Sequence, residues 1–319
     1  MDIVVLGDVM VDVLATLHAP FVPDADNPAD FVQALGGQAA NTAAWIDAAG
    51  SRAHLVGAVG ADSHGTWVTE RLRARRIECS LSTMQAATGQ CIVITEPAGG
   101  RTMLPNSGAN AMIAASGARQ QVIALLEGGA KHLHISGYVP LHDADFARQM
   151  VLVAGERGVS TSMDTPAVFP DSLWANRGDD SSVSALPPID ILLGTAPELL
   201  RWLQLPESDR LHTQAADVTA PMLAKRIAQL PDRPPTVVIK AGGQGAWLIT
   251  DRVVQVDPAA GRVVDTTGAG DAFTAGFLAA WTAGQSPETA ANRASVLAAR
   301  AVAQRGGQPT IDERHHGDS

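Results

Sequence analysis

The chain has 319 residues, 46% of them hydrophobic, which is enough to build the core of one large α/β domain. Its formal net charge of -10 and its only lysines, Lys131, Lys225 and Lys240, argue against a nucleic-acid partner, because phosphates favour a basic face. No stretch reaches the roughly 18 to 20 apolar residues of a membrane helix, and the N-terminus is acidic where a secretion signal is basic. We therefore expect a cytoplasmic protein that acts on a small molecule and contacts neither nucleic acid nor membrane.

Cysteines and closely spaced histidines are the first candidates for metal or redox chemistry. Cys79 and Cys91 lack a CxxC spacing and a neighbouring histidine pattern, so they indicate neither a disulfide framework nor a zinc site. We expect both to be ordinary apolar packing residues. His132 and His134 alternate along a strand-like run, and we expect them to form a structural pair whose ring nitrogens are satisfied inside the protein.

Short β-branched runs recur along the chain at residues 2–6, 54–59, 132–135, 189–193 and 236–240. Each is short enough to be a strand that is buried on both faces. Between them lie helix-length stretches rich in alanine, leucine and arginine, at 39–49, 65–76, 143–157 and 217–229. This alternation predicts an α/β fold with a mostly parallel central sheet and helices on both of its faces.

Two segments interrupt the alternation. Residues 12–35 contain three prolines, and residues 88–105 read as two strands joined by a Pro-Ala-Gly-Gly turn. We expect these segments to form a small β-sheet lid, inserted into a single catalytic domain that spans residues 1–319. Its strand edges could pair with a second copy of the chain, so we also expect a homodimer formed through the lid.

The stretch DTTGAGDAFTAGF at 265–277 indicates an anion site. A Gly-Ala-Gly turn lets backbone N–H groups converge, and the helix that follows adds the positive end of its dipole. Asp271 lies directly behind the turn, where a base beside an anion hole suits phosphoryl transfer to a hydroxyl. The residues alone leave a second interpretation open, in which Asp271 only caps the helix.

Familiar nucleotide-binding loops are missing, because no GxxxxGK[ST] occurs and GAGDAF lacks the last glycine of GxGxxG. The chain begins DIVVLG, like a dinucleotide-binding oxidoreductase, but the glycine fingerprint and the later ribose-binding acid of that class are absent. Any phosphate site must therefore use another scaffold.

The sequence VDTTGAGDAFTAGF resembles the C-terminal signature of the ribokinase-like (PfkB) carbohydrate kinases, and ALGGQAANTAAWIDAAG at 34–50 is similar to their N-terminal signature. The resemblance covers nearly the whole chain. It continues through GDVMVD (7–12), VGADSHG (59–65), RTMLPNSGAN (101–110), ISGY (135–138), VIKAGGQGAW (238–247) and RGGQPT (305–310). It implies a ribokinase-like three-layer α/β/α fold with a small β-sheet lid.

The resemblance also implies roles for individual residues. Asp271 would be the catalytic base, and the backbone of Gly268, Ala269 and Gly270 would stabilise charge on the transferring phosphoryl group. The acceptor site would consist of Asp12, Gly36, Gly37 and Asn41, whose carboxylate and amide groups suit vicinal hydroxyls. From the residues alone, Asp12 could equally be a turn residue and Asn41 a helix cap.

Cofactor positions follow from the same resemblance. ATP would lie between the loop after Lys240, which includes Gly243 and Gly245, and the helix 288–304 with Ser295, and Thr267 would also contact it. Glu198 would act on Mg2+ through water, although Thr195 replaces the asparagine of the family's NxxE motif. A first-turn helix acid behind Pro197 is the alternative role for Glu198. Several members are activated by K+, which implies a cation near Asp265, Thr267 and Thr310.

We therefore expect an ATP-dependent, Mg2+-requiring kinase that phosphorylates a hydroxyl, most simply a primary one, of a sugar or sugar-like substrate. Gln38 replaces the lysine common in ribokinases, so the acceptor could be another furanose, a ketohexose, a sugar acid or a nucleoside. A nucleoside kinase would need an aromatic platform, for which Trp45, Phe31 and Tyr138 are candidates. A sugar or nucleotide sensor without turnover is the alternative from another class, and the retained Asp271 argues against it.

Overall fold

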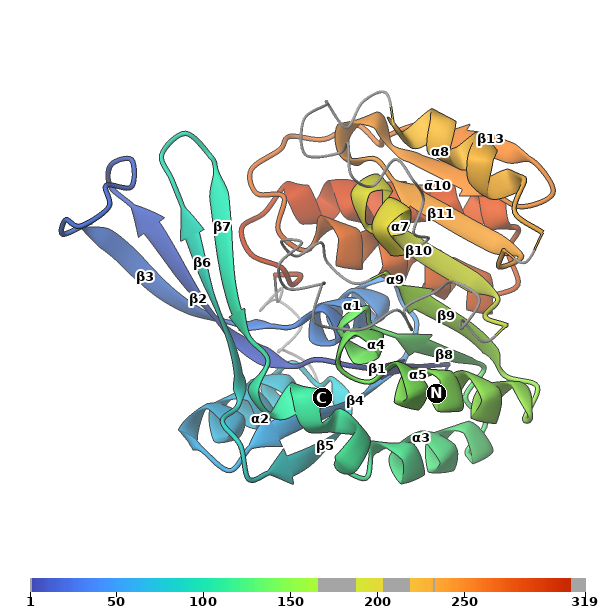
Figure 1. The fold of residues 1–319 in the computed structure, drawn as a ribbon, viewed down its shortest axis with the longest axis horizontal. Coiled ribbons are helices and arrows are strands. Elements are labelled where there is room, and N and C mark those ends of the chain that lie inside the picture. Colours follow the sequence, from blue (N-terminus) through green and yellow to red (C-terminus); the bar gives the residue numbers. More distant parts are fainter. Residues whose placement is uncertain (1, 166–187, 203–218, 232, 311–319) are drawn as a thin grey trace, which may run out of the picture.

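The computed structural model describes residues 2–165, 188–202, 219–231 and 233–310. In these residues a nine-stranded sheet is covered by helices on both faces, and a four-stranded sheet stands apart from it at the left of Figure 1. The predicted α/β class, with a mostly parallel sheet and a separate small lid sheet, is confirmed. None of the helices in the described residues is long and apolar enough to cross a membrane.

The strands of the large sheet are short and largely buried. Its order is β13-β12-β11-β10-β9-β8-β1-β4-β5. The strands from β5 to β11 run parallel to one another, whereas β12 and β13 are antiparallel additions at one edge. Their bounds are β1 (Ile3–Leu6), β4 (Ala53–Gly60), β5 (Glu78–Met84), β8 (His132–Ile135), β9 (Ser160–Asp164), β10 (Ile191–Thr195), β11 (Thr236–Lys240), β12 (Ala246–Ile249) and β13 (Val253–Val256).

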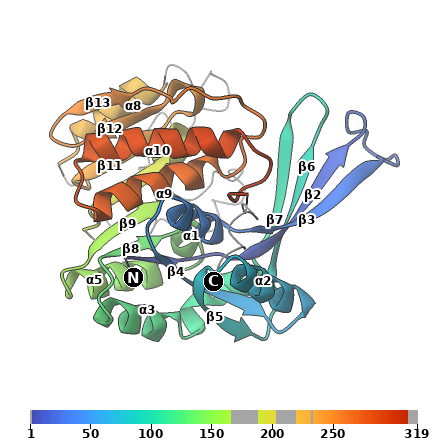
Figure 2. The same ribbon diagram turned by 180° about the vertical axis from the view of Figure 1, so that it is seen from behind.

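Helices form the two outer layers. The layer at the front of Figure 2 consists of α1 (Gln38–Ala48), α2 (Ser63–Ala74), α9 (Ala269–Thr282) and α10 (Pro287–Val302). The opposite layer consists of α3 (Ala118–Glu127), α4 (Tyr138–His142), α5 (Ala144–Gly155), α7 (Ala196–Trp202) and α8 (Thr219–Ala228). Two hydrophobic clusters, one on each face of the sheet, join these helices to the strands. Short 3-10 segments at Gly108–Ala115 and Gly242–Gln244 complete the described elements.

The lid is the four-stranded sheet. It has the order β3-β2-β6-β7, and its strands are β2 (Met10–Leu17), β3 (Ala29–Gly36), β6 (Gly89–Thr95) and β7 (Arg101–Asn106). The outer pairs are antiparallel hairpins, and the central pair of β2 and β6 is parallel. Because β2 and β3 lie between β1 and α1 in the chain, the lid is anchored beside the carboxyl end of β1.

Strands with polar sequences are the elements that the hydrophobic pattern does not predict. β9 reads STSMD, with serine and threonine where a buried strand usually has branched apolar residues, and yet its last four residues are buried. The hydroxyls of Ser160 and Ser162 are hydrogen-bonded to the two histidines of β8, and the hydroxyl of Thr161 donates to Asp190, which is why a polar strand can lie inside the sheet. Cys91 packs in the lid and Cys79 against the larger core, as expected.

Candidate active site

Polar side chains gather at the carboxyl ends of the parallel strands, which is where open α/β sheets bind ligands. Asp8 and Ser136 follow β1 and β8, while Asp164, Thr195 and Lys240 end β9, β10 and β11. α1 and α9 contact each other and bring their N-terminal residues to the same edge of the sheet. The edge therefore combines segments from the beginning, middle and end of the chain.

The two glycines of the Gly-Ala-Gly turn are subject to different steric constraints. Gly268 is the N-cap of α9 with a φ of 72°, and a Cβ there would lie 2.3 Å from the carbonyl oxygen of Gly307. Gly270 has an ordinary helical φ, and the nearest atoms to an added Cβ are 3.9 Å away, on Lys240. The protein itself thus demands glycine at 268, whereas glycine at 270 only keeps open the space in front of the turn.

Asp271 lies in the first turn of α9 and faces α1. Its Oδ2 accepts a hydrogen bond of 3.0 Å from Nδ2 of Asn41. The N-cap of α9 is Gly268, with no side-chain capping bond, so the interpretation of Asp271 as a helix cap is wrong. Burial raises the pKa of Asp271 to about 7, although the Asn41 hydrogen bond and the Lys240 charge act to lower it. A carboxyl group that titrates near neutral pH suits a general base.

The predicted acceptor residues surround the base of the lid. Asp12 is on β2, 9% exposed, and a Cβ on Gly36 would lie 2.2 Å from its carboxylate. Gly37 has a φ of 97° and is the N-cap of α1, so Asn41 does not cap this helix. Asn41 is 6% exposed, and its Oδ1 is buried without a hydrogen-bond partner among the described residues. An orphaned acceptor beside a buried carboxyl group indicates a site built for a ligand with hydroxyl groups.

Asp8 is a site residue that the sequence analysis did not identify. Its carboxylate accepts hydrogen bonds of 2.7 Å from the Gln38 backbone N–H and from Oγ of Ser136. Burial, and then the charge of Asp8, raise the pKa of Asp12 to about 7. Asp8 belongs to the GDVMVD segment, and its position directly after the first strand was the available signal. Gln38, where ribokinases carry lysine, accepts a hydrogen bond from the Gly137 backbone N–H.

Lys240 points beneath the glycine turn and into the sheet. Its Nζ donates to Oδ1 of Asp164 at 2.8 Å and to Oγ1 of Thr274 at 2.7 Å. Burial would raise the pKa of Asp164, but the charge of Lys240 and the contact with His134 hold it well below its usual range. The Lys240 ammonium group thus neutralises the carboxylate of Asp164, whose side chain is only 1% exposed. The sequence analysis missed Asp164 because it did not identify β9.

The histidine pair extends this buried network. His132 contacts the hydroxyls of Ser160 and Ser162 at 2.7 Å, and Nδ1 of His134 contacts Ser162 at 2.8 Å. Nε2 of His134 lies 3.5 Å from Oδ2 of Asp164. We predicted a structural pair whose ring nitrogens have partners inside the protein. Both nitrogens of His132 and Nδ1 of His134 have such hydrogen-bond partners, and Nε2 of His134 faces Asp164.

Glu198 follows β10 in the first turn of α7. Its Oε2 accepts from the Thr195 backbone N–H at 2.8 Å and from Oγ1 of Thr165 at 3.2 Å. Burial raises the pKa of Glu198. Among the described residues no three His, Cys, Asp or Glu side chains gather into a metal cluster. A single carboxylate such as Glu198 would be enough for Mg2+, which keeps several waters and takes other ligands from substrate phosphates.

The predicted adenine residues lie around the β11–β12 turn and α10. Gly245 has a φ of 82°, and a Cβ there would lie 2.0 Å from the carbonyl oxygen of Val256, so this glycine is required by the turn. Gly243 is exposed with open space around it. Ser295 donates to the carbonyl oxygen of Asp257 at 2.9 Å and accepts from the Ala259 N–H at 2.8 Å. Its hydroxyl therefore positions the loop after β13.

The three residues predicted for K+ are not joined to one another as a set. Asp265 accepts from the backbone and side chain of Thr267, at 2.9 and 2.7 Å. Thr310 instead contacts Oε1 of Gln304 through both its N–H and its hydroxyl. Arg101 of β7 forms an ion pair of 2.9 Å with Asp265. The sequence analysis did not single out Arg101, because nothing local to the lid hairpin points to a partner so distant in the chain.

One candidate aromatic platform is wrong. Trp45 is 1% exposed, and its Nε1 donates to the carbonyl oxygen of Gly307 at 2.9 Å, so its ring is part of the core and cannot stack on a base. Phe31 on β3 is 67% exposed, and Tyr138 at the start of α4 is half-buried. Burial, followed by the charge of Asp8, raises the pKa of Tyr138. Of the three candidate rings, Phe31 is therefore exposed and Tyr138 is partly buried.

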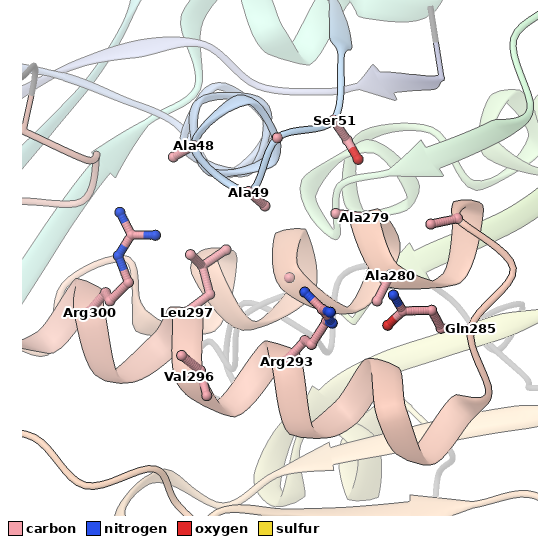
Figure 3. A pocket seen from close by; sticks show the side chains of 13 residues that line it. Ala48, Ala49, Ser51, Ala279, Ala280, Gln285, Arg293, Val296, Leu297 and Arg300 are labelled. Carbon is pink, nitrogen blue, oxygen red and sulfur yellow. The ribbon is translucent and has the colours of Figure 1, made fainter.

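An open hollow of about 470 Å³ lies on the other side of α9, between the end of α1 and α10 (Figure 3). Small residues of α1 and α9 form much of its lining, and Arg293 and Arg300 of α10 lie along it. None of the predicted site residues lines it. The hollow is therefore separate from the candidate active site.

Comparisons with known proteins identify the family to which the chain belongs. Residues 1–314 match the model of the pfkB family carbohydrate kinases. The ATP-dependent ribose-1-phosphate kinase of Halopiger xanaduensis is 28% identical over 306 residues, 93% of this chain and 92% of that protein. Ribokinase from Giardia lamblia has a TM-score of 0.76 at 22% identity, covering 96% of this chain and 95% of that one. Adenosine kinase from Sinorhizobium meliloti has a TM-score of 0.74 at 23% identity, covering 97% and 96%. The chain belongs to the pfkB family of carbohydrate kinases, which transfer phosphate to a hydroxyl group.

Proposed function

We propose that this kinase uses ATP and Mg2+ to phosphorylate a primary hydroxyl of a sugar or sugar-like acceptor, with Asp271 as the base. The observation that carries the proposal is the hydrogen bond between Asn41 and Asp271, which joins the predicted acceptor site to the predicted base. Both carboxyl groups of the site, Asp12 and Asp271, have a pKa near 7 because they are buried. The proposal includes the cytoplasmic location expected from the sequence, since ATP is available there.

The acceptor would lie between the lid and α1. Asp12 accepts hydrogen bonds from one or two hydroxyls, and the free Oδ1 of Asn41 accepts another. Nδ2 of Asn41 stays on Asp271, so the amide orients the base and the acceptor together. The reacting hydroxyl is thereby held near the ionised carboxylate, which lowers the barrier by positioning.

Proton transfer would move the hydroxyl proton to Oδ of Asp271 as the oxygen attacks the γ-phosphorus, and the bond from that phosphorus to the β,γ-bridging oxygen breaks. Charge on the transferring group is stabilised by the N–H groups at the start of α9, where Gly270 leaves space for it. Glu198 would hold Mg2+ through water, and the metal offsets the charge on the phosphates when bound. Closure of the lid excludes water and so limits hydrolysis of ATP.

Sugar acceptors are ranked before nucleosides because a nucleoside needs a surface for its base as well. Asp12 and Asn41 suit vicinal hydroxyls, which free sugars and the ribose of nucleosides both present, so these two residues do not separate the classes. A nucleoside would also need a surface for its base, and with Trp45 in the core only Phe31 and Tyr138 of the three candidates are available. The relatives include both classes, so a nucleoside kinase is the second candidate. A sensor without turnover would not need a base with a near-neutral pKa.

A coupled assay for ADP release over a panel of sugars, phosphorylated sugars, sugar acids and nucleosides tests the proposal. We expect turnover with one class of acceptor, dependence on Mg2+, and loss of turnover in Asp271→Asn. Asp190→Asn is the matched control and should keep turnover. Asp190 lies just before β10, and its carboxylate accepts a hydrogen bond from the Thr161 backbone N–H. ADP release that is independent of every acceptor would contradict the proposal.

We also propose that two copies associate through the lid. Its strands expose large apolar side chains that a monomer leaves in water: Phe31, Val32, Ile92, Met103 and Leu104, between 42% and 67% exposed. Edge strands with exposed apolar residues favour pairing with another copy. Mass in solution should be that of a dimer, and Val32→Glu with Leu104→Glu should produce a monomer. A wild-type monomer at micromolar concentration would refute this part.

A further inference from the structure

Arg101 is the residue of the lid that reaches the glycine turn. It begins β7, and its guanidinium group lies against three consecutive residues before the turn. Nη2 forms an ion pair of 2.9 Å with Oδ1 of Asp265 and donates to Oγ1 of Thr266 at 2.6 Å, and Nη1 donates to Oγ1 of Thr267. The side chains of Arg101 and Asp265 are 25% and 22% exposed, so the pair is partly open to water.

Asp265 organises the segment that leads into the turn. Oδ1 accepts from the N–H and hydroxyl of Thr267, and Oδ2 accepts from the Gly306 N–H at 2.9 Å. These bonds link the start of the glycine turn to the segment after α10. Burial acts to raise the pKa of Asp265, but its hydrogen bonds and the charge of Arg101 lower it overall, so the carboxylate is ionised at neutral pH. Arg101 is the cationic group that the structure places beside this carboxylate.

The donors around Asp265 leave little room for a K+ ion. Oδ1 already has three donors, one of them the guanidinium group, and Oδ2 has one. The hydroxyl of Thr267 donates to this carboxylate, and the hydroxyl of Thr310 is held by Gln304. A monovalent cation needs several free oxygens in a shell, and the predicted set does not supply them while the Arg101 guanidinium group contacts Asp265 and Thr267. The positive charge beside Asp265 is therefore supplied by the Arg101 side chain.

We propose that Arg101 is a positioning residue, carried by the lid, whose guanidinium group takes the place of a monovalent cation at Asp265 and orders Thr266 and Thr267 before the anion hole. Because Arg101 is on β7 of the lid and Asp265 is in the main domain, the pair links the lid directly to the segment before the glycine turn. The catalysed reaction should be independent of K+, unlike that of the family members that K+ activates.

The activity test rests on the proposed function and compares KCl with choline chloride at equal ionic strength. We expect the wild-type kcat in the two salts to agree within about twofold, because the Arg101 side chain supplies the positive charge at this site in either salt. Arg101→Gln should lower kcat by at least about tenfold in choline chloride, with a smaller change in KM, and KCl should restore part of the loss. Arg101→Lys, which keeps the charge but not the fork, should be intermediate.

Arg252→Gln is the matched control. Arg252 forms an equally short ion pair of 2.8 Å with Glu288, but this pair is on the surface away from the lid. Its loss should change neither kcat nor the response to K+. Strong activation of the wild type by K+ would overturn the proposal, and so would an Arg101→Gln variant with wild-type kcat in both salts.

Thermal unfolding provides a readout that needs no substrate. The Tm of the wild type should be equal in KCl and choline chloride, whereas the Tm of Arg101→Gln should be higher in KCl, because K+ then compensates Asp265. If no acceptor is phosphorylated, the proposed function fails, but this comparison still tests Arg101. Two results would contradict the role of Arg101: a wild-type Tm that is higher in KCl than in choline chloride, or a Tm of Arg101→Gln that is equal in the two salts.

Discussion

Asp271→Asn should abolish turnover and, at alkaline pH, make the protein more stable. The ionised carboxylate is partly buried, with Asn41 as its hydrogen-bond donor and Lys240 as a favourable charge. Asparagine has the same shape, and its side-chain oxygen can accept the Asn41 hydrogen bond without the cost of a buried charge. A residue kept for catalysis at the expense of stability should show both effects.

The magnitude follows from the pKa of Asp271, which burial raises from 3.8 to about 7 on folding. Below pH 4 the group is protonated in both the native and unfolded states, and its contribution to stability is fully present. Between pH 4 and 7 the native state binds more protons than the unfolded state, so stability falls as pH rises. Above pH 7 the ionised native group costs on the order of 2 to 4 kcal/mol, with solvent contact favouring the lower figure.

The assay is thermal unfolding of the wild type and Asp271→Asn from pH 5 to pH 8. A gain of 2 kcal/mol corresponds to a rise in Tm of roughly 3 °C for a chain of 319 residues, whose unfolding entropy is about 0.7 kcal/mol/K. The difference should be large at pH 8 and much smaller at pH 5. Asp62→Ala is the control of opposite sign, because Asp62 caps α2 through the Gly65 N–H at 2.8 Å, and its loss should cost about 1 kcal/mol.

Two outcomes would refute this reasoning. If Asp271→Asn were less stable than the wild type at pH 8, the carboxylate would be a stabilising structural group rather than a strained functional one. If the variant kept turnover, Asp271 would not be the base. Loss of turnover together with a gain in stability supports the base and its burial at once.

Further predictions concern the glycine turn, the pH dependence and the buried ion pair. Gly270→Ala should fold with wild-type Tm or slightly above it and lose turnover, whereas Gly268→Ala should also lower Tm, because its φ is 72°; equal Tm values for the two variants would contradict the steric argument. The logarithm of kcat/KM should rise by about one per pH unit up to about pH 7 and then level, as protonated Asp271 cannot accept the proton; a flat profile from pH 5 to 8 would exclude it as the base. Lys240→Met should lower the free energy of unfolding by about 3 to 5 kcal/mol, since Asp164 would be left buried and unpaired, and denaturant unfolding would show this.

Much of the fold could be predicted because its strands are short apolar runs. β1, β8, β10 and β11 stand out in the sequence as branched, buried segments between helical ones. β9 does not, because its burial depends on hydrogen bonds to the histidines of β8 that only the folded sheet brings together. A pattern based on hydrophobicity cannot detect a strand whose inward side chains are hydroxyls.

The candidate site also contains residues that the sequence predicted and residues that only the structure identifies. Asp271 and the glycine turn are contiguous in the sequence, so their chemistry can be inferred there. Asp8 and Asp164 act through partners distant in the chain, and neither belongs to a motif with a chemical meaning of its own. Arg101 is the clearest case, because 164 residues separate it from Asp265 and only the position of the lid places the two together.

Transfer of labelled phosphate is the most direct test of the central claim. ATP labelled at the γ-phosphate should be incubated with the acceptor panel, and the products separated by charge and size. We predict that the label appears on a hydroxyl of a sugar or sugar-like acceptor with the wild type and on none with Asp271→Asn. Label that remains on ATP or appears only as free phosphate for every acceptor, or equal transfer by the variant, would contradict the account.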